Sequence, residues 1–296
     1  MSPAPRTPLR LAEETWRAEA TAHQARLDPV LTPYLAQRSA GGKDPVLDFL
    51  FEYYHLRPSH LRRWSPGVGV VLEGAAQAFL ERPGFIQTPA GVTLDPTAFP
   101  ARRRTALSWT LGLLRQTAER PAFLGCSGLH EWAMVYRAET VRHNQLPLRL
   151  PREALAAFVE SRPVVCSHFD AFRFFTPAAR PLNKLQPTRA AMPSLEQPGC
   201  LHTNMDLYRW ALKAYPWIPG TVLIETFLLA LRARRLDMQA SPYDLRAYGL
   251  PPVRIETDAG RRHYRGAQKA IAESAAPIRQ RLIKAYERVL QYVAET

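Results

Sequence analysis

Residues 219–236 read Pro-Gly-Thr-Val-Leu-Ile-Glu-Thr-Phe-Leu-Leu-Ala-Leu-Arg-Ala-Arg-Arg-Leu and form the most apolar helix that the sequence predicts. A helix of this composition is expected at the buried centre of a domain, where neighbouring elements cover it. The longest apolar run, from Ile218 to Leu231, is interrupted by Glu225 and followed by Arg232. It falls short of the roughly 18–20 apolar residues that cross a bilayer, so no membrane partner is expected.

Helical patterns dominate the rest of the chain as well. Further helices are predicted at 11–27, from Asp44 to about 54, and at 58–64, 100–119, 151–161, from about 201, and 260–293. The pair Asp28-Pro29 predicts a break after the first of them. The chain of 296 residues is therefore predicted to be mainly α, with one helical domain over residues 11–296. Residues 1–10 are expected to be a disordered lead, because three prolines block regular structure there.

A small β element is expected at about residues 67–95 and 253–257. Phe85-Ile-Gln-Thr and Val92-Thr-Leu, separated by Pro-Ala-Gly, predict a β-hairpin. The preceding Pro66-Gly-Val-Gly has two interpretations. It could be a helix-hairpin-helix turn that offers backbone N–H groups to a DNA phosphate, but Val68, Val70 and Val71 favour a strand.

The charge of the chain indicates a polyanionic partner. Lysine and arginine number 39 against 26 aspartate and glutamate residues, a formal net charge of +13. Such a charge favours nucleic acid, so DNA bound through a basic surface is the expected partner, although an arginine-rich composition can also reflect a GC-rich genome. No protein partner is inferred. The first residues lack the apolar core of a signal peptide, so a cytoplasmic location is expected.

Residues 166–210 concentrate the groups that could do chemistry. They contain His168, Asp170, His202 and Asp206 among several aromatic residues, a mixture that is typical of a wet pocket with apolar walls. On a helix that starts near Leu201, His202 and Asp206 lie four residues apart and share a face. By residue type, His168, Asp170 and His202 also match the two-histidine, one-carboxylate site of iron enzymes. Each histidine could equally bind a buried backbone or aspartate partner.

Two acidic residues outside this stretch are further candidates. Glu131 lies between Leu129, Trp132 and Met134 and could act as a general base in an apolar wall, or it could pair with an arginine. Asp237 follows the apolar helix at its C-terminal end, where a negative charge is unfavourable without a partner. The three cysteines form neither a disulfide framework nor a zinc motif, and buried thiols are the default interpretation.

Several runs resemble a bacterial protein family usually labelled 3-methyladenine DNA glycosylase. Two of them are Gly128-Leu-His-Glu-Trp-Ala-Met-Val-Tyr-Arg and Gln197-Pro-Gly-Cys-Leu-His-Thr-Asn-Met-Asp-Leu-Tyr. The others occupy residues 43–51, 166–183, 236–245 and 253–257. The resemblance extends over about residues 12–290 and implies removal of alkylated bases from DNA. The resemblance assigns no role to any residue, so the candidate site residues are chosen from their chemistry.

A glycosylase extrudes the damaged base, stacks it on aromatic walls and uses a carboxylate to stabilise the sugar cation or to activate water. The candidate catalytic carboxylates are Asp237, Glu131, Asp170 and Asp206. The candidate substrate-binding residues are His130, Trp132, Tyr136, His168, Phe172, Arg173, His202, Asn204, Tyr208 and Tyr243. No cofactor is expected in this hypothesis. The alternatives are an iron or zinc enzyme that uses His168, Asp170 and His202 on a small or nucleotide-like substrate, and a nucleic-acid-binding protein without catalysis.

Overall fold

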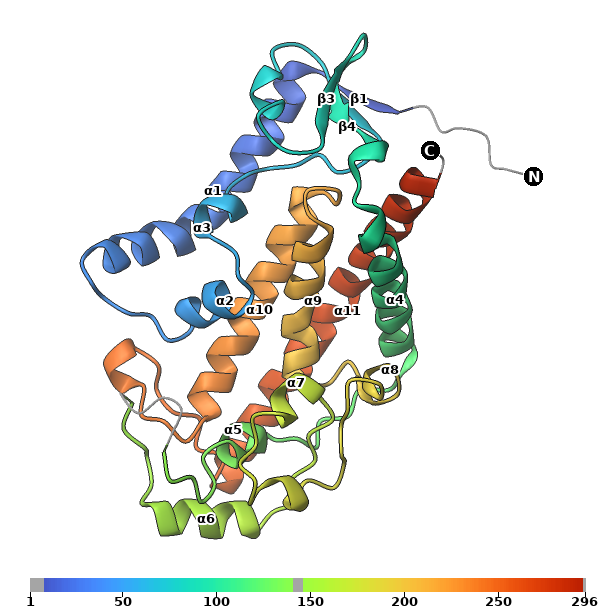
Figure 1. The fold of residues 1–296 in the computed structure, drawn as a ribbon. Helices are drawn as coiled ribbons and strands as arrows, with labels where there is room; N and C mark the ends of the chain where they lie inside the picture. Colours follow the sequence, from blue (N-terminus) through green and yellow to red (C-terminus); the bar gives the residue numbers. More distant parts are fainter. Residues whose placement is uncertain (1–7, 141–145, 295–296) are drawn as a thin grey trace.

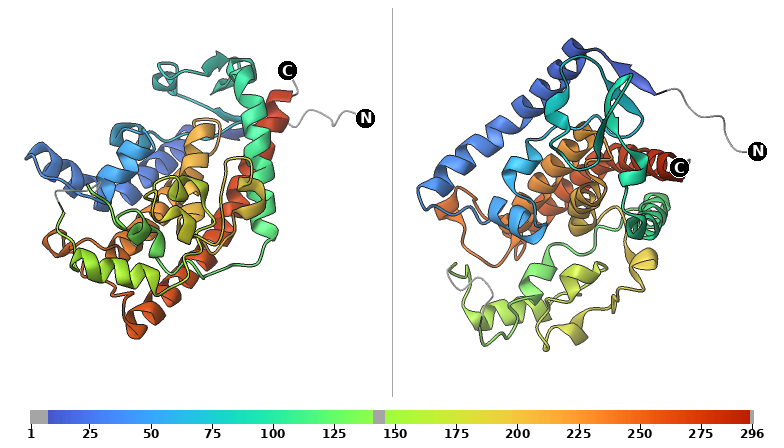
Figure 2. Two further views of the ribbon diagram at one scale, coloured as in Figure 1. Left: turned by 60° about the horizontal axis from the view of Figure 1, so that its bottom comes forward. Right: turned by 45° about the horizontal axis from the view of Figure 1, so that its top comes forward.

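The computed structural model describes residues 8–140 and 146–294, and it is mainly α-helical with a small sheet, as the sequence predicts. The centre is α10 (Gly220–Ala240), which is packed by α9 (Leu201–Ala214) and α11 (Asp258–Ala294) (Figure 1). Most of α10 is buried, which confirms the prediction that the most apolar helix is the central one. Helix α4 (Ala101–Glu119) lies against α11 (Figure 2).

Helix α1 (Glu13–Ser39) extends along the outside of the bundle and contacts α10. The predicted break at Asp28-Pro29 is wrong, because the helix continues through Pro29 and Pro33. Proline removes one helical hydrogen bond, at a cost of about 3 kcal/mol in a helix interior. Burial of Leu27, Leu31 and Tyr34 on one face of α1 offsets that cost. Helices α2 (Leu47–Tyr53) and α3 (Pro58–Leu61) follow.

The sheet lies at one end of the bundle, close to the end of α11 (Figure 1). Its strands are β1 (Leu9–Leu11), β2 (Val70–Leu72), β3 (Phe85–Thr88) and β4 (Gly91–Leu94), in the order β1-β2-β4-β3. Strand β1 is parallel to β2 and the other pairs are antiparallel. The register that pairs Phe85 with Leu94 and Thr88 with Gly91 confirms the predicted hairpin, and the strand at Val70 replaces the helix-hairpin-helix interpretation.

Two predictions about strands are wrong. Residues 9 and 10 belong to β1, so the disordered lead does not extend to residue 10. Residues 253–257 are irregular and turn into α11 rather than forming a strand. Val253 and Ile255 are buried while Arg254 is exposed, which explains the strand-like alternation. The amide of Val253 nevertheless donates a hydrogen bond to Gln239 O at the end of α10. In the described part of the chain, no strand forms β-sheet hydrogen bonds with these residues.

Short elements fill the other end of the bundle, next to the candidate site. They are α5 (Leu129–Ala133), α6 (Arg152–Glu160), α7 (Phe169–Phe172) and α8 (Met192–Leu195). Prolines recur through residues 163–198, which keeps helices there short. Single 3₁₀ turns occur at Gln77–Phe79, Pro96–Ala98, Arg180–Leu182 and Arg246–Tyr248. Over the described ranges, none of the helices combines the length and apolarity that a bilayer crossing requires.

Candidate functional site

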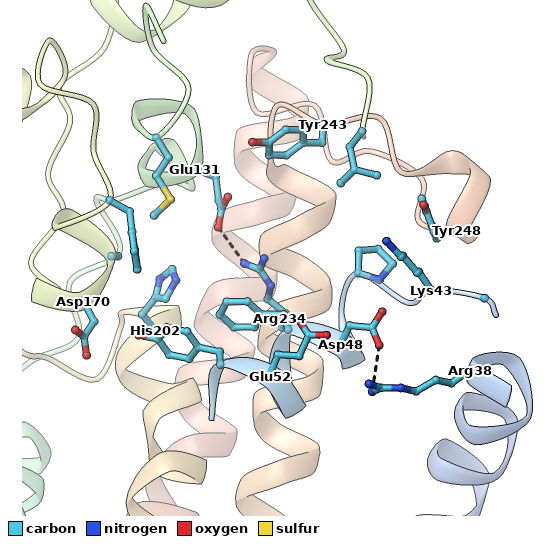
Figure 3. A pocket seen from close by; sticks show the side chains of 18 of the residues that line it. Arg38, Lys43, Asp48, Glu52, Glu131, Asp170, His202, Arg234, Tyr243 and Tyr248 are labelled. Atoms are coloured by element: carbon cyan, nitrogen blue, oxygen red, sulfur yellow. Dashed lines mark hydrogen bonds and ion pairs between the residues drawn. The ribbon is translucent and has the colours of Figure 1, made fainter. Parts of the chain in front are cut away.

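A cavity of about 650 Å³ opens where the chain segment 41–53 faces α5, α7, α9 and α10. Its walls include the rings of Phe49, Tyr53, Phe174, Tyr243 and Tyr248. Figure 3 shows Glu131, His202 and Arg234 from three different helices converging on the interior, with Lys43 and Arg38 on the side of the 41–53 segment. The volume lies within the roughly 300–1,000 Å³ that is usual for small-molecule sites.

A buried ionic network forms the inner end of the cavity. Arg234 Nη1 donates to Glu131 Oε1 at 3.0 Å and to Asp237 Oδ2 at 2.6 Å. On the far side of Asp237, His130 Nε2 lies 2.6 Å from Oδ1. The side chains of Arg234, Glu131 and Asp237 are 3%, 7% and 0% exposed, so water screens their charges little. Only Glu131 and Arg234 of this network line the cavity.

The two carboxyl groups of the network differ in their electrostatics. Burial and then the charge of Asp237 raise the pKa of Glu131, although Arg234 opposes the shift. Burial also acts to raise the pKa of Asp237, but the charge and hydrogen bond of His130 outweigh it and lower that pKa. Asp237 is therefore a fixed negative charge inside the protein. Glu131 is the group with access to the cavity and the more easily protonated of the pair.

His202 supplies a neutral imidazole to the cavity wall. Burial lowers its pKa well below the usual value, and the charges of His130 and His168 add to this effect while Asp237 opposes it. Its Nε2 lies 3.9 Å from Asp237 Oδ2, beyond hydrogen-bond distance. The ring packs edge-on against His130 and is stacked with His168 at centroid distances of 4.6 Å and 5.3 Å. The neutral imidazole can accept a hydrogen bond from a bound molecule at its unprotonated nitrogen.

A second buried polar group lies behind the α9 side of the cavity. His168 Nε2 is 3.4 Å from Asp206 Oδ2 and 3.8 Å from Glu196 Oε1. Asp206 also accepts a hydrogen bond from the Tyr54 hydroxyl at 3.1 Å and one from Arg209. Burial raises the pKa of Glu196 to about 7, because the uncharged form is favoured away from water.

The predicted metal triad is not assembled. Metal-binding atoms of described residues approach within 4.8 Å of one another in two groups, His130/Glu131/His202/Asp237 and His168/Glu196/Asp206. Asp170 belongs to neither group. It pairs instead with Arg173 at 3.1 Å and with Arg209, which explains an aspartate in this position without a metal ion.

The ligand atoms of the first group are largely engaged, whereas two atoms of the second group, His168 Nε2 and Glu196 Oε1, form no hydrogen bond with a described residue. In the first, Arg234 neutralises the two carboxylates and His130 is bound to Asp237. In the second, His168 Nδ1 accepts the N–H of Ala171, so the ring carries a proton on Nε2. That nitrogen then presents a proton rather than a lone pair to the carboxylates. The first group therefore fits a guanidinium and a proton better than a metal ion.

Four of the predicted site residues line the cavity. They are Glu131, Asp170, His202 and Tyr243. Asp237 and His130 lie directly behind it in the ionic network, and Asp206 and His168 lie behind it in the second polar group. His202 and Asp206 share α9, as predicted, but each contacts a different group.

The remaining predicted residues have structural surroundings. Trp132 Nε1 donates to Ala240 O at 2.8 Å, and the Tyr136 hydroxyl donates to Glu160. Asn204 accepts a hydrogen bond from Arg279, and Tyr208 packs against Tyr54 and Phe227. Phe172 packs against Phe175. Arg173 is half-exposed beside Asp170.

The sequence interpretation missed Arg234, Phe49 and Tyr53. Arg234 lies three residues before Asp237 on the most apolar helix, and a cation and an anion at that spacing on a buried helix are a detectable signal of a buried ion pair. Its guanidinium carbon lies 4.0 Å from the centroid of the Phe49 ring, which fixes the arginine from the cavity side.

No family model, curated protein or solved structure matches the chain. The function is therefore argued from the cavity and the groups that line it.

Proposed function

We propose that the protein is a DNA glycosylase that binds an extruded alkylated purine in the cavity and hydrolyses its N-glycosidic bond with the help of Glu131. The observation that carries the proposal is that a buried carboxylate, Glu131, and a neutral imidazole, His202, lie within 4.8 Å of each other at the inner end of an aromatic-walled cavity. A flipped base is held by stacking on such walls and by hydrogen bonds to its edge.

The chemistry requires little of the protein once the base is bound. An alkylated purine is positively charged and leaves readily, so a carboxylate that stabilises the sugar cation or takes a proton from water is sufficient. Glu131 lines the cavity and can reach a bound base. Its pKa is raised, so its carboxylate is a stronger base than an ordinary glutamate. Arg234 holds the Glu131 carboxylate in place through the 3.0 Å hydrogen bond.

Basic residues at the cavity provide contacts for a DNA backbone. Lys43 is exposed and the Arg38 side chain is 51% exposed, and both line the cavity on the side of the 41–53 segment (Figure 3). The net charge of +13 adds long-range attraction for a polyanion. These features support DNA as the substrate.

The test is release of free base from methylated DNA, measured by chromatography with wild-type protein and Glu131→Gln. We expect wild-type protein to release 3-methyladenine, and Glu131→Gln to reduce the rate by about 10²–10⁴-fold because the general base is lost. Glu273→Gln, an isosteric change at a side chain that is 67% exposed on α11, is the matched control and should keep full activity.

Either of two results would overturn the proposal. If wild-type protein binds methylated DNA but releases no base, the protein is a binding protein. If Glu131→Gln retains the wild-type rate while its circular dichroism is unchanged, the carboxylate has no catalytic role.

A further inference from the structure

Cys126 and Cys166, which lie 40 residues apart along the chain, interact behind the ionic network, and Cys200 is close enough for the charge of Cys126 to affect it. Cys126 Sγ lies 3.1 Å from His130 Nδ1, and the other ring nitrogen of His130 lies 2.6 Å from Asp237 Oδ1. Thiol, imidazole and carboxylate thus form a continuous chain. This is the arrangement by which a histidine activates a nucleophile while a carboxylate orients the ring.

The local backbone is shaped to make this contact. Ser127 and Gly128 both adopt left-handed conformations, with φ of +49° and +77°. A non-glycine residue in this region is uncommon, and such strain of about 1–3 kcal/mol persists where the surrounding structure enforces it. The resulting turn brings Cys126 against His130 at the start of α5. The amide of Leu129 donates a hydrogen bond to Cys126 O at 3.0 Å across this turn.

Three thiols in one place have three different electrostatic environments. Interaction with the Cys166 thiol and then the charge of His130 hold the pKa of Cys126 well below its usual value, against the effect of burial. Cys126 interaction and burial raise the pKa of Cys166, and burial raises that of Cys200 to about 11. Tyr264 of α11 faces the same group, and burial keeps it uncharged. Cys126 is therefore the thiol of the three that loses its proton most readily.

The charge of His130 agrees with this assignment. Burial acts to lower its pKa, but Cys126 on one side and Asp237 on the other outweigh burial and raise it well above the usual value. The two ring nitrogens of His130 contact the Cys126 sulfur and the Asp237 carboxylate, so a charged ring has an acceptor on each side. Cys126 is also the least buried of the three cysteines, whereas Cys166 and Cys200 are buried.

We propose that Cys126 is a peroxide-reactive nucleophile and that Cys166 is its resolving thiol, so that the pair forms a reversible disulfide. The reaction differs from base excision and uses no residue that lines the cavity, although His130 and Asp237 belong to the ionic network that also contains Glu131. The Cys166 thiol interacts with Cys126 and lies in an irregular segment before α7.

The reaction balances with hydrogen peroxide as the oxidant. The Cys126 thiolate attacks one peroxide oxygen, the O–O bond breaks, and the leaving hydroxide takes a proton from the His130 imidazolium to give water and Cys126 sulfenic acid. The Cys166 sulfur then attacks the Cys126 sulfur, the S–O bond breaks, and hydroxide leaves as water with the thiol proton. Two thiols lose two electrons to one peroxide, and two waters form.

The first test is alkylation of the full-length reduced protein with iodoacetamide at pH 6, followed by peptide mass spectrometry. We expect Cys126 to react at least about 100-fold faster than Cys200, because an ordinary thiol is almost wholly protonated at that pH, even after allowing for the lower nucleophilicity of a stabilised thiolate. Equal rates for the two cysteines would overturn the proposal, as would an unreactive Cys126.

The second test treats the protein with equimolar hydrogen peroxide. We expect a Cys126–Cys166 disulfide in wild-type protein that dithiothreitol removes. In Cys166→Ser, dimedone should instead label the sulfenic acid on Cys126, and the matched control Cys200→Ser should form the disulfide as the wild type does. Absence of the disulfide in wild-type protein, or its loss in Cys200→Ser with unchanged circular dichroism, would refute the assignment. Neither test depends on base release, so failure of one proposal leaves the other standing.

Discussion

Replacement of Arg234 by methionine tests whether the ionic network depends on this one guanidinium. Arg234 is the shared cation of Glu131 and Asp237 and its side chain is 3% exposed. Removal of one partner from a buried ion pair costs about 3–5 kcal/mol, because the remaining charge stays buried. With an unfolding entropy of about 2.1 cal/mol/K per residue, a chain of this length should lose roughly 5–8 °C in melting temperature.

The loss of stability in Arg234→Met should also depend on pH, and the direction of this dependence follows from the pKa of Glu131. Arg234 opposes the upward shift of the Glu131 pKa, so its removal raises that pKa further above the unfolded value of about 4.3. A group with a raised folded pKa contributes its stability at low pH and loses it as the pH rises through that pKa. Arg234→Met should therefore differ less from the wild type at pH 5 than at pH 8.

The assay is urea unfolding followed by circular dichroism at both pH values. Arg235→Met is the matched control, because Arg235 is the exposed neighbour on the same helix and should change the free energy of unfolding by less than about 0.5 kcal/mol. If Arg234→Met costs no more than Arg235→Met, or if its deficit is the same at pH 5 and pH 8, the reasoning about the network is wrong.

Two further predictions concern the second polar group and the DNA contact. Glu196 has a pKa of about 7 in the folded protein, so wild-type stability should fall as the pH rises from about 4.3 to 7. Glu196→Gln should remove roughly 3 kcal/mol of that dependence, measured by urea unfolding at pH 5 and pH 8; an unchanged slope would contradict the assignment. Lys43→Gln should weaken binding to double-stranded DNA and reduce the slope of log affinity against log salt concentration by about 1, measured by fluorescence anisotropy. An unaltered slope would mean that Lys43 does not contact a DNA phosphate.

The helices were predictable because their signals are local. The apolarity of residues 219–236, the length of the 260–293 pattern and the hairpin at 85–94 each depend on residues that are near neighbours in the chain. The errors arose where distant packing decides the outcome. Pro29 lies inside α1 because Leu27 and Leu31 are buried against other elements, and within residues 8–140 and 146–294 no strand pairs with residues 253–257.

The sequence by itself determined a mainly helical protein with a buried central helix, a terminal helix and a small hairpin, together with the residue types that could form a site. Only the tertiary structure decided which of those residues meet. His130 and Asp237 are 107 residues apart, and Glu131 and Arg234 are 103 apart. Sequence periodicity shows which face of a helix is apolar, but it does not show which side chains of two distant helices will form a hydrogen bond or an ion pair. That choice depends on how the helices pack, because hydrogen bonds and buried charges act over a few ångströms.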